Sequence, residues 1–550
     1  MKKIVYLIVC MCTVWCYSCS YSDLSSNAGN PIPDLIIDTT GVPYPLVTKL
    51  GEQLVVEPKV SSASNPERDF SYEWRISNVP NASTTLMDLN LTVVGREEKL
   101  NYTVVLPPDA TTYQLWYIVV DNKSGLVANK MWRLLVEMDA TQGLLVAHSD
   151  DGVTTELSLL QDTLFTAAFR GTTDKAPDPT KINHIFSTIH GAKYNGIVKE
   201  MLFRLRYHDG RLLNCLEAHS GDNIFRLNLL TYTKLEEGQN MFLDTKPVVL
   251  DIKALFLGSN AMLNAYPAYN YPCNIWNNRG FYKSVGPTAT GSMSLSGYGA
   301  PSVGSPPDAL AYGRAPEYDP DPILSKSYNS NSIMFYDRLY GRFLILDSYM
   351  WNDRNTRPTE TTHSDGLPFD SRNVGALDIL AAGSGNNSDC RFVVKQNGVY
   401  RILSMNQNNG SARAIIEINN APNIAKATHF AICINQPVVY YATSDNEIYS
   451  IHFVDGLGNI VTYSKVWTSS DPINGLYFTR QCDAARPIRY HGTALVATTT
   501  ANQSEGKVWV LPFVFQAGST TVIAGTGEID NSKIVSFSGF GRISTITMVE

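Results

Sequence analysis

Residues 138–162 read MDATQGLLVAHSDDGVTTELSLLQD, and the pattern of the chain changes at this stretch. Leu144–Ala147 and Val153–Leu160 are rich in apolar side chains, and Ser149-Asp150-Asp151-Gly152 separates them. An Asp-Gly pair between two apolar runs is a strong short-range signal for a β-hairpin. We therefore predict a hairpin at this stretch, and we place a domain boundary at residue 138.

The sequence after residue 138 repeats a turn between short strand-like segments at intervals of roughly fifty to sixty residues, a spacing typical of propeller blades. The flanking segments are rich in β-branched and aromatic residues, and no helical segments alternate with them. We predict an all-β fold in which residues 139–550 form a β-propeller of about seven blades. The turns that mark the blades are Asp151-Gly152, Asp209-Gly210, Gly258-Ser259-Asn260, Asp337–Gly341, Asn397-Gly398, Asp455-Gly456 and Ser504-Glu505-Gly506.

The last residues of the chain offer a way to close such a ring. Ile543–Val549 is a strand candidate. Pairing this segment with the strand near Leu144 would remove the exposed edges of an open array of sheets. We therefore expect the final strand to complete the first blade.

Two stretches between the turns are long enough to be insertions. Residues 264–331 are dominated by Pro, Gly, Asn, Ser and Tyr, and residues 349–373 are polar and charged. Loops this long inside a compact fold are usually functional or disordered. Aromatic rings stack on the apolar faces of sugars and extended peptides, while amide side chains supply hydrogen bonds. We predict a glycan- or peptide-binding surface built from Tyr266, Tyr269, Tyr271, Trp276, Tyr349 and Trp351.

A second interpretation of these aromatic residues is that they pack the insertion against the blades. The same group contains further rings, Phe281, Tyr282, Tyr298, Tyr312 and Tyr318. The sequence leaves both interpretations open.

Residues 35–138 carry six or seven short strand candidates in about a hundred residues, which favours an immunoglobulin-like sandwich. Phe70–Ile76 is one of these candidates, and Trp74 lies within it. A tryptophan at such a position is typically buried between the sheets of a sandwich. We expect Trp74 to be a core residue and not a platform for a ligand.

The first residues have the pattern of a secretion signal. Lys2 and Lys3 precede the apolar run Ile4–Trp15, and the small residue Ser18 stands directly before Cys19. We predict a signal peptide over residues 1–18, acylation of Cys19, and a lipidated tether over residues 19–34. Such an anchor would hold the protein stably on the lipid of the outer membrane. The alternative is simple cleavage and secretion.

Composition and charge exclude some classes of partner. The chain has 44 Lys and Arg against 51 Asp and Glu, a formal net charge of -7, and no basic run after residue 3. This balance argues against nucleic acid as a partner. After acylation of Cys19 an odd number of cysteines remains, Cys215, Cys273, Cys390, Cys433 and Cys482. At least one thiol is therefore expected to be unpaired, and Cys433 is expected in the core.

Searches for catalytic motifs find none of the common ones. The chain has no GxSxG elbow, no HExxH, no phosphate-binding GxxxxGK[ST] and no EF-hand spacing. The histidines, His219 among them, are spread without the spacing of metal ligands. Glu217, Asp319 and Asp321 are the acidic residues that a two-carboxylate glycosidase would draw on. We predict no catalytic residue, no metal site and no cofactor.

Two segments of the N-terminal domain carry a resemblance to a known family. Phe70-Ser71-Tyr72-Glu73-Trp74 and Tyr113–Asp121 are similar to the Tyr-x-Trp strand and the closing Val-x-Asp strand of PKD domains. Together with the lipoprotein start and the ending Gly539-Phe540-Gly541-Arg542-Ile543, the whole chain resembles the PKD-like lipoproteins of Bacteroidota. Proteins of that family are often encoded beside SusC/SusD-type nutrient-uptake systems.

The resemblance implies a surface-exposed outer-membrane lipoprotein that binds or retains an extracellular nutrient, a glycan or a peptide, for an uptake complex. It implies a binding protein and not an enzyme, with a SusC/SusD-type transporter as a candidate partner. Two alternatives stay open. One is a hydrolase that uses carboxylates on the propeller face, and the other is a structural or adhesive partner of other surface proteins.

Overall fold

A computed structural model of the chain describes residues 34–549 except 64, 78–90, 107–111, 138–141, 163–165, 167–179, 209–210, 243–246, 248, 258–272, 278–279, 286–296, 302–304, 312, 326–331, 348–356, 386–388, 435, 455–460, 479–493, 503 and 515–527. The chain divides into two compact units, Met1–Glu137 and Met138–Glu550. This division lies next to the predicted boundary at residue 138. Cys19 and the predicted tether lie outside the described residues.

The first unit is built from β-strands in three sheets. A five-stranded sheet has the order β2-β9-β8-β5-β6, and β1-β4 and β3-β7 form two smaller sheets. Strands β2 and β9 pair in parallel, whereas their neighbours pair antiparallel. The strands are β1 (Ile36–Asp38), β2 (Leu46–Lys49), β3 (Gln53–Val56), β4 (Lys59–Ser61), β5 (Phe70–Ser77), β6 (Leu91–Gly95), β7 (Leu100–Thr103), β8 (Tyr113–Asp121) and β9 (Val127–Glu137).

The core of the first unit forms where these sheets meet. Alternate residues of β5 and β8 are buried together with residues of β3, β7 and β9. Trp74 is fully buried, its ring stacks on Tyr117, and its indole N–H donates to the Glu97 carbonyl at 2.9 Å. Trp74 is therefore a core residue, as its sequence position predicts. The assignment of this unit to the immunoglobulin or PKD-like class stays a prediction.

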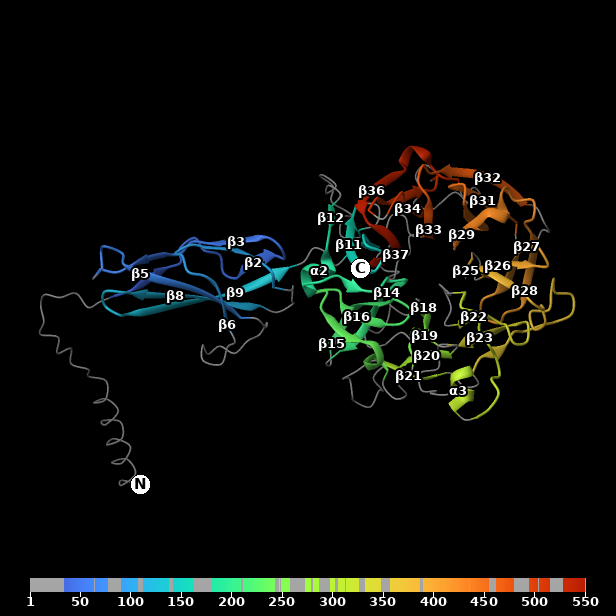
Figure 1. Cartoon of the computed structure of the whole chain (residues 1–550), viewed down its shortest axis with the longest axis horizontal. Helices are drawn as coiled ribbons and strands as arrows, with labels where there is room; N and C mark the ends of the chain where they lie inside the picture. Colours follow the sequence, from blue (N-terminus) through green and yellow to red (C-terminus); the bar gives the residue numbers. More distant parts are fainter. Residues whose placement is uncertain are drawn as a thin grey trace, which may run out of the picture. The chain divides into compact units, whose positions relative to one another are not determined.

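The second unit is a β-propeller. Its described residues form seven antiparallel sheets. In six of them the strands follow one another along the chain, whereas the first combines β10 to β13 with the last strand, β37. Figure 1 shows the sheets arranged one after another around a ring, with β14, β18, β22, β25, β29, β33 and β37 nearest its centre. The predicted all-β fold with a propeller is confirmed by this topology.

The first three blades cover the stretch up to residue 301. Blade 1 contains β10 (Gly143–Ser149), β11 (Thr154–Gln161), β12 (Thr180–Ile182) and β13 (Tyr194–Asn195). Blade 2 contains β14 (Glu200–His208), β15 (Arg211–His219), β16 (Ile224–Asn228) and β17 (Lys234–Glu237). Blade 3 contains β18 (Ile252–Leu257), β19 (Cys273–Asn277), β20 (Gly280–Val285) and β21 (Gly297–Pro301).

The last four blades complete the ring. Blade 4 has β22 (Ser332–Asp337), β23 (Arg342–Asp347) and β24 (Thr359–Glu360), and blade 5 has β25 (Asp378–Ser384), β26 (Asp389–Gln396), β27 (Val399–Asn406) and β28 (Ala412–Glu417). Blade 6 has β29 (Ala427–Ile432), β30 (Val438–Thr443), β31 (Glu447–Phe453) and β32 (Val461–Thr468). Blade 7 has β33 (Ile473–Phe478), β34 (Ala494–Thr500), β35 (Gly506–Pro512) and β36 (Val535–Phe540).

Short helices lie between the strands of the propeller. The α-helices are α2 (Ile185–His190) and α3 (Pro306–Ala311), and the 3-10 helices are η3 (Gly238–Met241), η5 (Ile424–Lys426) and η6 (Asn531–Lys533). The buried carboxylate of Glu156 accepts hydrogen bonds from the backbone N–H groups of Phe186 and Ser187 and so satisfies the first turn of α2. No helix of the described residues is long and apolar enough to span a membrane.

The ring closes through the last strand, as predicted. Strand β37 (Arg542–Val549) pairs antiparallel with β10 along the whole length of that strand, from Gly143↔Val549 to Ser149↔Arg542. The buried side chain of His148 supports this contact, because its Nδ1 accepts a hydrogen bond from the Gly541 N–H at 3.1 Å. Blade 1 is therefore assembled from both ends of the unit.

Four of the predicted turns lie between paired strands, among them Asp337–Gly341 between β22 and β23 and Ser504-Glu505-Gly506 between β34 and β35. The other three, Asp209-Gly210, Gly258-Ser259-Asn260 and Asp455-Gly456, lie outside the described residues. Asp151-Gly152 joins β10 to β11, and Asn397-Gly398 joins β26 to β27. Asn397 has φ 51° and Gly398 has φ 83°, the pair of positive values that a two-residue hairpin turn of type I′ requires. The Asn-Gly pair supplies the two residues that adopt this conformation at least cost.

The predicted insertion at residues 264–331 differs from the structure. This range contributes β19, β20 and β21, which are three of the four strands of blade 3. Phe281, Tyr282 and Tyr318 are buried there, so for these three rings the packing interpretation holds. These strands were not predicted because they are poor in β-branched residues and so have a weak intrinsic preference for β-structure. Pairing with neighbouring strands outweighs that weak preference.

Candidate functional site

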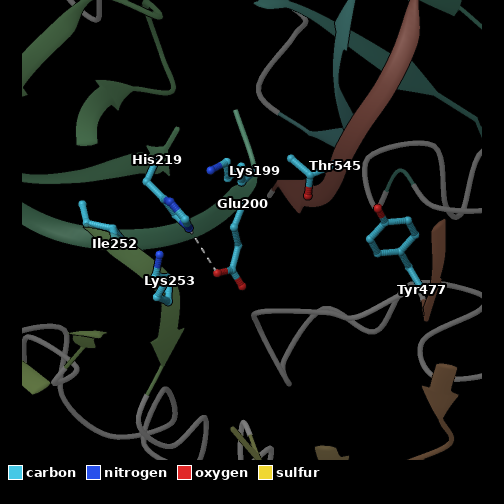
Figure 2. A pocket seen from close by; sticks show the side chains of 7 residues that line it. All are labelled: Lys199, Glu200, His219, Ile252, Lys253, Tyr477 and Thr545. Carbon is cyan, nitrogen blue, oxygen red and sulfur yellow. Dashed lines mark ion pairs between the residues drawn. The ribbon is translucent and has the colours of Figure 1, made fainter. Parts of the chain in front are cut away.

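A cavity of about 260 Å³ opens among the inner strands of the propeller. Its lining comes from five separate segments of the chain, because blades 2 and 3, blade 7 and the closing strand meet at this point. Figure 2 shows the charged side chains on one side and Tyr477 on the other, with Thr545 between them. The lining residues are Lys199, Glu200, His219, Ile252, Lys253, Tyr477 and Thr545.

Glu200 and His219 are held side by side by the register of blade 2. Glu200 begins β14, His219 ends β15, and the two residues are direct cross-strand partners. Glu200 Oε2 accepts a hydrogen bond from the Leu255 N–H at 2.8 Å, and this contact joins blade 2 to blade 3. His219 Nε2 lies 3.6 Å from Glu200 Oε2. The carboxylate is therefore fixed by the backbone, and the imidazole faces it across a gap.

The imidazole of His219 is buried and uncharged near neutral pH. Its side chain is 2% exposed, and neither ring nitrogen has a hydrogen-bond partner among the described residues. Burial, aided by the positive charges of Lys199 and Lys253, lowers the pKa of His219 to about 4. A neutral imidazole offers one N–H donor and one acceptor nitrogen. His219 therefore adds both kinds of hydrogen-bonding group to the lining of the cavity.

The two lysines occupy different positions at the rim. Lys199 precedes β14, and its backbone N–H donates to the His219 carbonyl at 2.8 Å. Its ammonium lies over the turn at Gly221, where a Cβ would stand 2.7 Å from Lys199 Nζ. Gly221 has φ 105°, a backbone conformation that favours glycine. The absence of a side chain at this position also leaves room for the Lys199 ammonium. Lys253 follows Ile252 on β18 and pairs with Asp251 at 2.5 Å.

Tyr477 forms the opposite wall. Its ring crosses Gly475 so closely that a Cβ there would lie 2.6 Å from the Tyr477 hydroxyl oxygen. Burial raises the pKa of Tyr477 to about 12, although hydrogen bonds with Thr498 and Thr545 oppose the shift. The hydroxyl therefore stays protonated, and the wall combines an aromatic face with neutral polar groups.

The described lining has the chemistry of a binding site for a small polar molecule. It offers cations, one carboxylate, a neutral imidazole, hydroxyl groups and an aromatic ring. The described residues contain no group of three or more His, Cys, Asp or Glu side chains that could hold a metal ion. Cys215, Cys390 and Cys433 are buried and do not belong to the lining of this cavity.

The ligand-binding residues predicted from the sequence are not part of the described lining. Tyr266, Tyr269, Tyr271, Tyr349 and Trp351 lie outside the described residues. Trp276 lies on β19, where its register partners are Ala254 on β18 and Phe281 on β20. Ala254 follows Lys253 directly, so Trp276 is placed one strand outward from the cavity wall. The predicted aromatic surface stays a prediction.

The acidic residues considered for a glycosidase have structural partners. Glu217 is fully buried and pairs with Arg226. Asp319 bonds to Arg338, and Asp321 accepts from the Ile323 N–H at 2.9 Å. Burial raises the pKa of Asp321. None of the three lines the described cavity.

No protein-family model and no curated protein matches the chain. Among solved structures, the chain is similar to a quinoprotein alcohol dehydrogenase-like protein from Bacteroides thetaiotaomicron, with a TM-score of 0.47 and 11% identity over 94% of this chain and 99% of that chain. Dihydro-heme d1 dehydrogenase NirN gives a TM-score of 0.35 and 11% identity over 78% and 72% of the two chains. The Dos1 propeller gives a TM-score of 0.33 and 13% identity over 58% of this chain and 68% of that chain.

Similarity at this level carries no argument about activity. The description of the second unit as a propeller rests on its own strand order and closure. Sequence reasoning names His219 only as one histidine among several, and it misses the other lining residues, Lys199, Glu200, Ile252, Lys253, Tyr477 and Thr545. They belong to distant segments, and no local motif marks them.

Proposed function

We propose that this chain is a lipid-anchored protein of the outer-membrane surface whose propeller binds a small polar nutrient without converting it. The single observation that supports binding most strongly is the cavity itself. A buried histidine whose ring nitrogens have no hydrogen-bond partner among the described residues costs free energy, and a ligand that bonds to the ring recovers that cost.

The lining favours binding over the carboxylate hydrolase. A glycosidase of the common type needs an acid and a second carboxylate on the two sides of the bond that is cleaved. Glu200 is the one carboxylate of the described lining, and its Oε2 already accepts from the Leu255 N–H. The proposed role is capture of a nutrient, a glycan-derived sugar or a peptide-derived compound, for delivery to a SusC/SusD-type transporter.

A panel of compounds tests the cavity as the ligand site. We expect at least one compound among neutral sugars, sugar acids and amino acids to raise the melting temperature of the full chain. Lys253 is half exposed, so Lys253→Trp places an indole at the rim of the cavity without disturbing the core. This variant should fold normally and lose the ligand-induced shift. A shift that survives in Lys253→Trp, or the absence of any shift in the wild-type chain, would contradict the proposal.

The lipid anchor is tested by Cys19→Ala. An acyl anchor with several chains holds a protein stably on a membrane, so we expect its loss to move the processed protein from the outer-membrane fraction to the soluble fraction. The measurement is immunoblotting of cell fractions, and Cys215→Ala is the matched cysteine control. If Cys19→Ala still fractionates with the outer membrane while no precursor remains, the anchor lies elsewhere.

A further inference from the structure

The charges around the cavity indicate the charge of its ligand. Lys253 shares its ammonium with Asp251, and Glu200 bonds to the backbone of blade 3. Lys199 forms no ion pair within the described part of the chain, and Gly221 leaves room for its ammonium beside the cavity. Because His219 is neutral, the Lys199 ammonium is the charged group of the described lining that can attract a charged group of the ligand. The lining therefore favours a ligand with one negative group.

The gap between His219 and Glu200 indicates a second kind of ligand group. The 3.6 Å between His219 Nε2 and Glu200 Oε2 is too long for a direct hydrogen bond. A hydroxyl group both donates and accepts, so one ligand hydroxyl can donate to the carboxylate and accept from an imidazole N–H. A ligand with hydroxyl groups would give the His219 ring the hydrogen bond that the described residues do not supply.

The far wall and the size of the cavity limit the shape of the ligand. Tyr477 faces the charged side chains across the cavity, as Figure 2 shows, and Ile252 adds a further apolar surface. The volume of about 260 Å³ lies just below the usual range for drug-sized ligands, roughly 300 to 1,000 Å³. One ring with an apolar face fits this space, whereas an extended chain does not.

We propose that the cavity binds a sugar acid, a single hydroxylated ring that carries one carboxylate. Its carboxylate pairs with the Lys199 ammonium, a hydroxyl bridges His219 and Glu200, and a face of the ring lies against Tyr477. This inference rests on the proposed function and specifies its ligand. A neutral sugar could make the same contacts with Tyr477, His219 and Glu200, but it has no carboxylate to pair with the Lys199 ammonium.

Calorimetric titration of the full chain in detergent with hexuronates and the matching neutral hexoses tests this inference. Glucuronate is compared with glucose, and galacturonate with galactose. Lys199 is exposed, and an ion pair at an exposed position contributes up to about 1 kcal/mol, which corresponds to a preference of up to about fivefold for the acid. We expect Lys199→Met to remove the preference, Lys199→Arg to keep most of it, and Lys426→Met, at an exposed lysine, to leave it unchanged.

The outcomes separate this inference from the proposed function. If acid and neutral sugar bind equally, or if Lys199→Met keeps the preference, the sugar-acid inference fails and the binding function stands. If only amino acids bind, and Lys253→Trp blocks them, the same conclusion holds. If no compound of the panel binds the wild-type chain, both fail. A preference for the acid that depends on the charge at position 199 supports both.

Discussion

Deletion of residues 539–550 is expected to abolish the cooperative unfolding transition of the propeller. Strand β37 supplies apolar side chains to two different cores: Val549 packs with blades 1 and 2, whereas Ile543 and Met548 pack with blades 1 and 7. Burial of one such side chain stabilises by about 1.5 to 3 kcal/mol, so three of them contribute on the order of 5 kcal/mol or more. That is comparable with the whole stability of many domains, about 5 to 15 kcal/mol.

Calorimetry and limited proteolysis measure the effect of this deletion. The open edge of β10 should also expose a row of unpaired backbone groups, so the truncated chain is expected to aggregate. Deletion of residues 20–33 is the matched control, because it removes a similar length of chain that belongs to the first unit and not to the propeller. A truncated chain that melts at the wild-type temperature would show that β37 does not close the ring.

Glu217→Gln is expected to destabilise the propeller by about 3 to 5 kcal/mol, because it removes one partner of a buried ion pair. Arg226 is fully buried between two cross-strand neighbours: its Nε donates to Glu217 Oε1 at 3.0 Å and its Nη1 to Glu236 Oε2 at 2.5 Å. Glutamine keeps the shape of the side chain but not its charge. The guanidinium then loses the counter-charge of the fully buried Glu217 and keeps that of Glu236.

Chemical denaturation of matched variants measures this effect. Asp445→Asn breaks the exposed pair with Lys426, and surface pairs contribute only about 0 to 1 kcal/mol. Glu217→Leu combined with Arg226→Met should recover much of the stability, because neither of the two fully buried charges remains and Glu236 keeps some contact with solvent. If Glu217→Gln costs no more than Asp445→Asn, the pair is not a structural element, and a functional role for Glu217 would have to be reconsidered.

The architecture of the propeller could be predicted because local signals repeat around it. Asp151-Gly152 and Asn397-Gly398 fix tight turns through their own backbone preferences. The apolar pattern of Ile543–Val549 predicts a strand, and no neighbouring segment in the sequence offers it a pairing partner. Blade 3 could not be predicted in the same way. Gly297–Pro301 reads GYGAP and has little intrinsic tendency to form a strand, yet it pairs with β20. Its structure depends on its neighbours.

The cavity could not be predicted because its residues meet only after the ring has closed. Lys199 and Thr545 lie at opposite ends of the propeller sequence, and the pairing of β37 with β10 brings their segments together. His219 stands alone in the sequence, with no spacing that would mark a ligand. Blade order and strand register decide which inner strands line the cavity together. Neither blade order nor register is encoded in a local motif.

The cavity between the inner strands is the proposed ligand site of the propeller. A crystal structure of the full chain grown with glucuronate or galacturonate tests this proposal directly. We predict density for one sugar ring between Lys199 and Tyr477, with a hydroxyl bonded to both His219 and Glu200. Density for the sugar only at the aromatic residues of the 264–331 range, with the cavity holding solvent, would contradict the proposal.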